Sequence, residues 1–131
     1  MDILITLPKN LIEKILSGEK TVEVRSRRPI KFDLYNDIVY VVQKGTRRVV
    51  MDFTIERFVD VDYAGLLFYY NEGNVGVDLD WLTKYAANKK TFSIWYIGCV
   101  TSLDCIDLTL DKMPVKAAPQ SYTYVKTLFD I

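Results

Sequence analysis

One segment of eight residues, GEKTVEVR at positions 18–25, constrains this chain more than any other part of its sequence. An amphipathic helix precedes it and ends at Gly18, because glycine readily adopts the left-handed conformation that closes a helix. The following residues alternate as in a strand, with Val22 and Val24 on one face. The opposite face carries only polar side chains, Thr21, Glu23 and Arg25. A short strand whose polar face holds charges of both signs indicates that this face lines a groove.

Three charged side chains of this segment are candidates for binding or catalysis. Lys20 stands at the entry to the strand, where a bend directs it toward the same groove. It would bind a phosphate as a point charge, or lose its proton in a dry cleft and act as a base. Arg25 would hold a phosphate or a base edge with its planar guanidinium. Glu23 would orient Lys20 or accept a hydrogen bond from a base amino group. We expect all three on one solvent-accessible concavity, with Glu23 between the two cations.

The same residues also have purely structural interpretations. Lys20 would complement the dipole at the C-terminus of the helix, and Glu23 and Arg25 would pair with neighbouring strands. Arg27 and Arg28 follow the strand, where they would attract a polyanion or remain ordinary surface charges.

The charge of the chain is balanced overall but not locally. Lysine and arginine together equal aspartate and glutamate at 17 each, whereas residues 20–48 contain eight basic and three acidic side chains. A basic region on a neutral protein favours an anionic ligand of limited size over a long duplex.

The composition excludes several chemistries. The chain has no histidine, which removes the usual general acid-base group, the Ser-His-Asp and Cys-His schemes and most transition-metal sites. Cys99 and Cys105 are too few for a disulfide scaffold, and we expect them to be unpaired. We expect no metal site and no cofactor. The sequence has no membrane span and no recognisable signal peptide, so we expect a cytoplasmic protein.

The order of elements predicts a single domain over residues 1–131, of the α+β class. We expect a small mixed, partly closed β-barrel with helices packed outside. Strands are predicted at 3–6, 21–25, 37–43, 48–59, 91–100 and 106–110, and helices after Pro8, after Asp62 and after Asp78. A final helix or turn is predicted from Ala118 to about Leu128.

Aromatic residues add two expectations. Trp95 and Tyr96 alternate in a strand, so one is expected in the core, and Trp95 is our candidate for stacking on a nucleobase. Trp81 and Tyr85, a helical turn apart, are expected in the core. The apolar run from Tyr63 to Tyr70 is hard to bury on one helix face and predicts a homodimer seam.

Read as G-x-K-x-x-E-x-R after a helix, residues 18–25 resemble the signature of the ASCH domain, a β-barrel of the PUA-like kind. The resemblance covers nearly the whole chain, from the first strand through the hairpin, a helical insertion and an aromatic strand to Pro119-Gln120-Ser121. It implies a cleft on one side of the barrel that binds RNA or modified nucleosides, with Ser121 at its rim.

The family resemblance also implies two enzymatic activities. Some relatives look like nucleases. Others look like amidohydrolases that deacylate a modified cytidine, using a lysine, a threonine three residues later and a glutamate from the helical insertion. Here Lys20 matches the lysine and Glu72 is a plausible acid, but the third residue after the lysine is Glu23.

A second departure from the family pattern lies in the strand after the hairpin. Many relatives have Gly-Glu where this chain has Met51-Asp52, and the lost glycine would narrow the approach of a ligand to the backbone.

Three functions follow as hypotheses. The first is an RNA- or nucleotide-binding domain with metal-independent ribonuclease activity, in which Lys20 stabilises the phosphorane and Glu23 or Glu72 acts as the base. The second is an amidohydrolase acting on an acylated cytidine nucleoside. The third is a non-catalytic module that binds a protein.

Overall fold

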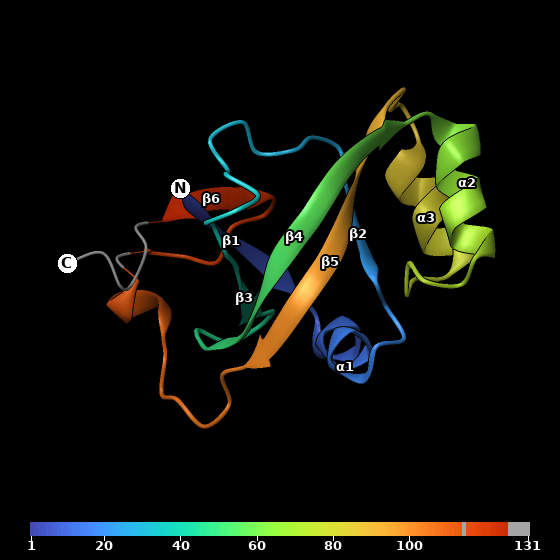
Figure 1. The fold of residues 1–131 in the computed structure, drawn as a ribbon. Helices are drawn as coiled ribbons and strands as arrows, with labels where there is room; N and C mark the ends of the chain where they lie inside the picture. The colour runs from blue at the N-terminus through green and yellow to red at the C-terminus, as the bar shows by residue number, and fades with distance from the viewer. Residues whose placement is uncertain (114, 126–131) are drawn as a thin grey trace.

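The computed structural model describes residues 1–113 and 115–125. Its helices and strands follow the predicted order closely (Figure 1). The elements are β1 (Asp2–Leu7), α1 (Lys9–Ser17), β2 (Val22–Arg25), β3 (Val39–Gln43), β4 (Val49–Val61), α2 (Tyr63–Asn71), α3 (Leu79–Ala86), β5 (Phe92–Ser102), a short 3₁₀ turn (Leu110–Lys112) and β6 (Tyr122–Val125).

The strands form one mixed sheet in the order β2-β5-β4-β3-β1-β6. β1 and β3 are parallel, and the other neighbouring strands are antiparallel. β4 and β5 are long and curve together across the molecule, while β2 and β6 are the two edges (Figure 1). The sheet is curved but not closed, so the predicted α+β fold with a partly closed barrel is confirmed.

Alternation along the strands distributes the apolar side chains between the two faces of the sheet. Ile3 and Ile5 of β1 join a cluster that also contains α1 and Trp95. Leu4, between them, joins a second cluster with the segment that includes Leu110. A third cluster lies where α2 and α3 cover β2 and the neighbouring part of β5.

The helix ends agree with the residues that predicted them. Gly18 has a φ of 84° and donates its N–H to the carbonyl of Ile15, which closes α1 in the left-handed conformation. Asp62 and Asp78 cap α2 and α3 through their side chains, which accept hydrogen bonds from Gly65 N and Trp81 N.

Two predicted elements near the C-terminus are wrong. In place of a strand at 106–110 there is only an isolated bridge between Thr109 and Arg48, followed by the 3₁₀ turn. In place of the helix or turn predicted from Ala118 to about Leu128, residues Tyr122–Val125 form β6 and pair with β1. This short strand exists because the edge of β1 is free to pair, which local sequence does not reveal. Residues 126–128 of the predicted helix lie outside the described residues.

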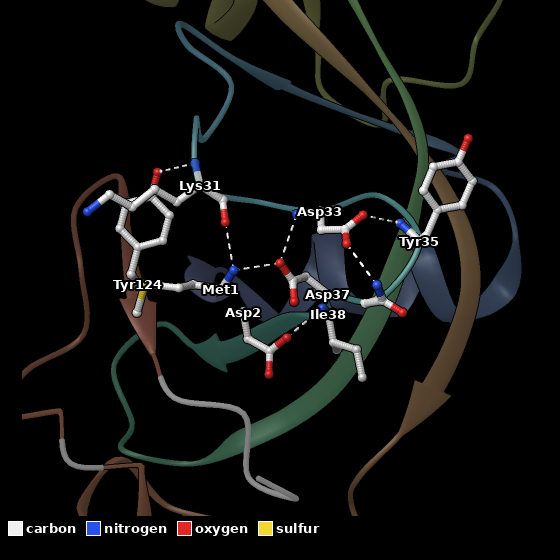
Figure 2. Close-up of polar contacts among 9 residues, drawn as sticks. Met1, Asp2, Lys31, Asp33, Tyr35, Asp37, Ile38 and Tyr124 are labelled. Atoms are coloured by element: carbon white, nitrogen blue, oxygen red, sulfur yellow. Dashed lines mark hydrogen bonds and ion pairs between the residues drawn. The ribbon is translucent and has the colours of Figure 1, made fainter.

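The long loop between β2 and β3 is held firmly to the end of the barrel (Figure 2). The N-terminal amine of Met1 donates to the carbonyl of Lys31 and to Asp37, each at 2.6 Å. The Asp37 carboxylate also accepts from the backbone N–H of Asp33, and Lys31 N donates to the hydroxyl of Tyr124 at 3.1 Å. The loop is therefore tied to both β1 and β6. None of the helices within the described residues is long and apolar enough to cross a membrane.

Candidate functional site

A cleft of about 1060 Å³ lies beside β2. Its walls come from the start of α1, the loop before α3, one side of α3 and the segment before β6. The charged side chains on its surface are four cations and two carboxylates: Lys14, Arg25, Lys44, Lys89, Glu23 and Asp78. The cleft therefore has an excess of positive charge around a small number of carboxylates.

Glu23 lies between Lys20 and Arg25, as the spacing predicts. Its Oε1 is 3.6 Å from Lys20 Nζ, and its Oε2 is 3.7 Å from Arg25 Nη2. The Glu23 side chain is only 7% exposed, yet it lines the cleft. The negative charge of Glu23 thus lies between the positive charges of Lys20 and Arg25.

Lys20 does not reach solvent, so the expectation of an accessible lysine is wrong. Its side chain is 1% exposed, and Nζ donates to the carbonyls of Val22 at 2.7 Å and Val75 at 2.6 Å. Gly76 packs closely against the aliphatic part of the Lys20 side chain. A Cβ added at Gly76 would lie only 3.0 Å from Lys20 Cδ. With its donors directed at two carbonyls and Glu23, Lys20 does not line the cleft and acts as a positioning residue.

The pKa values of this pair follow from burial and from their neighbours. Burial lowers the pKa of Lys20 below its ordinary value, although Glu23 acts in the opposite direction. Burial would raise the pKa of Glu23, but the charges of Lys20 and Arg25 and a hydrogen bond from Val24 N hold it below the usual range. Glu23 is therefore ionised at neutral pH, as an acceptor of hydrogen bonds only.

One oxygen of this carboxylate has no hydrogen-bond partner. Oε1 accepts from the backbone N–H of Val24 at 3.0 Å, whereas Oε2 is buried and unpartnered among the described residues. A buried carboxylate oxygen without a donor is costly to maintain. Arg25 Nη2 lies 3.7 Å from this oxygen, which is an ion-pair distance and too long for a hydrogen bond. Glu23 lines the cleft, so an N–H or O–H group that reaches its carboxylate would supply the missing hydrogen bond.

α3 contributes an aromatic wall to the cleft. The rings of Trp81 and Tyr85 are stacked, with centroids 5.1 Å apart and planes 9° apart. Trp81 is 47% exposed, and Lys89 Nζ lies 4.2 Å from the centroid of the Tyr85 ring. The prediction that Trp81 belongs to the core is wrong. Leu82 and Ala86 form the buried stripe of this short helix, and Trp81 lies to one side of it.

Trp95 does not serve as a stacking platform. It is fully buried in the core against Phe58, with the Arg25 guanidinium 5.9 Å from its ring centroid. The strand alternation placed Trp95 and Tyr96 on opposite faces, but both faces of the sheet are covered at this position. Trp95 is therefore a core residue that lies next to the Arg25 guanidinium.

The remaining predicted residues are dispersed. Ser121 lies at the rim of the cleft, where its carbonyl accepts from Arg25 Nη1 at 3.0 Å. Arg27 is exposed and lines a separate groove next to the cleft. Arg28 is exposed but lines neither depression, and Glu72 is exposed at the C-terminal end of α2, outside the cleft. Lys20 and Glu72 therefore do not meet in one accessible site.

The departure at Met51-Asp52 also lies away from the cleft. Met51 is fully buried in the core and Asp52 faces Tyr40 of β3, and neither lines the depression. The expectation that Met51 narrows the approach of a ligand is therefore wrong.

Comparison with solved structures identifies the fold. A point mutant of the ASCH protein from Zymomonas mobilis matches with a TM-score of 0.79 at 18% identity, over 97% of this chain and 89% of that one. The ASCH structure from Zymomonas mobilis without a named mutation matches with a TM-score of 0.75 at 19% identity, over 95% and 87%. No protein-family model matches the sequence, and no curated protein matches it significantly. The chain thus has the ASCH fold that its signature predicts.

Proposed function

We propose that this protein binds single-stranded RNA or nucleotides in the cleft beside β2. The observation that carries the proposal is Glu23, a buried, ionised carboxylate that lines the cleft and whose Oε2 has an ion-pair contact with Arg25 but accepts no hydrogen bond from the described residues. Nucleobases bring N–H donors on a flat edge, which is the chemistry that such an acceptor selects.

The other groups of the cleft suit the rest of a nucleotide. Trp81 offers an exposed indole for stacking a base, already supported by the parallel ring of Tyr85. Lys14, Lys44 and Lys89 supply positive charge for phosphate groups on the same surface. Lys14 Nζ and Lys89 Nζ each donate to one backbone carbonyl, of Gly76 and Tyr85, and an ammonium has two further N–H donors. Arg25 is engaged by Ser121 and Glu23, so its role is to hold the carboxylate in place.

The two enzymatic hypotheses require groups beyond those needed for binding. In the ribonuclease hypothesis Glu23 would remove a proton from the 2′-hydroxyl, and its lowered pKa makes it a weak base for that step. In the amidohydrolase hypothesis Glu23 occupies the place of the threonine nucleophile. Incubation of the folded protein with single-stranded RNA and with an acylated cytidine tests each activity by the appearance of product.

Binding is tested with a six-nucleotide single-stranded RNA labelled at its end and followed by fluorescence anisotropy. We expect affinity to fall as salt rises, and Trp81→Ala to weaken binding by about tenfold or more, since stacking contributes roughly 1–3 kcal/mol per base. Leu79→Ala is the matched control, because Leu79 is 44% exposed on the same helix but does not line the cleft. No binding by the folded wild type, or equal losses in both variants, would overturn the proposal.

A homodimer through the Tyr63–Tyr70 run is a second candidate, favoured by one observation. Phe68 is 60% exposed on α2, whereas Leu66 of the same helix is fully buried. If α2 forms a dimer seam, sedimentation equilibrium will show a dimer that Phe68→Glu converts to a monomer. A wild-type monomer at high concentration would exclude it.

A further inference from the structure

We propose that the cleft continues into a second nucleotide subsite at the open seam between β2 and β6, centred on Arg27. The ligand would then be a strand of at least two nucleotides rather than a free nucleotide. This inference rests on the proposed function and adds the length and path of the ligand to it.

A second groove of about 520 Å³ adjoins the cleft. It is lined by residues that follow β2 and by residues 121–124. Ser26 and Ser121 line both depressions, so the two are direct neighbours at that point. Each volume is of the size that holds a small organic ligand or somewhat larger. Together they form a path that leads out of the cleft along the seam.

The chemistry of the second groove differs from that of the cleft. Among the described residues its lining has one cation, Arg27, no acidic residue, and several serine, threonine and tyrosine residues. Arg27 is exposed and makes no hydrogen bond or ion pair with the described residues, in contrast to Arg25. An exposed guanidinium in a groove lined by serine, threonine and tyrosine residues is suited to a phosphate diester, which accepts hydrogen bonds from guanidinium and hydroxyl groups.

The groove is also built from fixed elements. Tyr122 and Tyr124 pack edge to face at 5.7 Å on β6. Tyr124 accepts from the backbone of Lys31, and the loop between β2 and β3 is anchored further by Met1 and Asp37 (Figure 2). The Lys31 ammonium lies 5.8 Å from the Tyr124 ring centroid. A second cation, Lys31, therefore lies next to one of the two tyrosines that line the groove.

The test compares a nucleoside 5′-monophosphate with a 5′-phosphorylated dinucleotide of the same base, by titration followed by NMR. Arg27→Ala is paired with Arg28→Ala, which removes an adjacent exposed arginine that lines neither depression. We expect the dinucleotide to bind about tenfold more tightly than the monophosphate. Arg27→Ala should abolish most of that gain and leave the monophosphate affinity unchanged, whereas Arg28→Ala should alter neither.

Each other outcome counts against the second subsite. Equal affinity for the two ligands overturns it, as do equal effects of the two arginine variants, while binding of the monophosphate leaves the proposed function intact. If the folded protein binds neither the monophosphate nor the dinucleotide, both proposals are overturned. Since both arginines are exposed, unchanged thermal unfolding of the variants shows that any loss comes from the groove.

Discussion

The carboxylate of Glu23 lies 3.6 Å from the ammonium of Lys20, and both side chains are almost completely buried. Lys20 is held by two backbone carbonyls and Glu23 is held by Val24 N, so neither is free to turn away from the other. The signature of the segment thus combines two roles. Lys20 fixes the strand and the loop before α3, and Glu23 lines the cleft with one carboxylate oxygen that accepts no hydrogen bond from the described residues.

The first prediction concerns this buried pair. Lys20→Met should lower the free energy of unfolding by about 3–5 kcal/mol, because it removes the cation nearest to a buried carboxylate. The double variant Lys20→Met with Glu23→Gln should recover part of this loss, since the uncompensated charge is then absent. Urea denaturation of the two single variants and the double variant measures the coupling. Strictly additive losses would contradict the pairing.

The second prediction concerns which bases the cleft accepts. Cytosine presents an amino group where uracil presents a carbonyl oxygen, so Oε2 of Glu23 should favour cytidine monophosphate over uridine monophosphate by about tenfold. Glu23→Gln should reduce this preference, because the amide can donate as well as accept. The same variant should bind inorganic phosphate more tightly, since a negative charge is lost. Isothermal titration with the three ligands checks both effects, and a base preference that survives in Glu23→Gln would disprove the role.

The third prediction separates backbone strain from side-chain packing at two glycines. Gly73 and Gly76 have φ values of 80° and 85°, but only Gly76 has Lys20 where a Cβ would be. Gly73→Ala should cost roughly 1–2 kcal/mol for the left-handed conformation alone. Gly76→Ala should cost more, because the loop must also move away from Lys20. Thermal and urea unfolding measure the loss of unfolding free energy in each variant. Equal losses would show that a Cβ at Gly76 does not clash with Lys20.

The fourth prediction concerns alkaline pH. Burial and the charges of Asp2 and Asp52 raise the pKa of Tyr40 to about 12. The neutral phenol is favoured in the folded state, so its contribution to stability is complete below pH 10 and is lost as pH rises through about 12. Tyr40→Phe should therefore lose less stability than the wild type between pH 10 and 12.

At pH 7 the same Tyr40→Phe variant should change the free energy of unfolding by less than about 1 kcal/mol, because the buried hydroxyl has no hydrogen-bond partner among the described residues. Urea denaturation at neutral and alkaline pH gives both values. Parallel profiles of unfolding free energy against pH for the two proteins would show that folding does not raise the pKa of Tyr40.

Local sequence predicts the features of this fold that are local in origin. Gly18, Asp62 and Asp78 mark helix ends through their own backbone and side-chain chemistry, and all three agree with the structure. The alternation of the strand after Gly18 likewise places Glu23 and Arg25 on one face, next to each other in space.

What depends on distant segments is not predictable in this way. Lys20 is buried because Val75 and Gly76, more than fifty residues later, close over it. Trp95 is buried because the sheet is covered on both faces at its position, while Trp81 is exposed because α3 is short and its apolar stripe narrow. β6 forms because the edge of β1 is free to pair. The aromatic wall of the cleft therefore emerges only from the three-dimensional structure.

The central claim is that a nucleotide ligand occupies the cleft between Glu23 and Trp81. It is tested most directly by titrating a short single-stranded RNA into ¹⁵N-labelled protein and mapping the amide shifts. The account predicts shifts concentrated at residues 23–27, 76–81 and 120–124, together with the indole N–H of Trp81. Shifts confined to α2 or to residues 103–113, or no shifts at all in the folded protein, would contradict it.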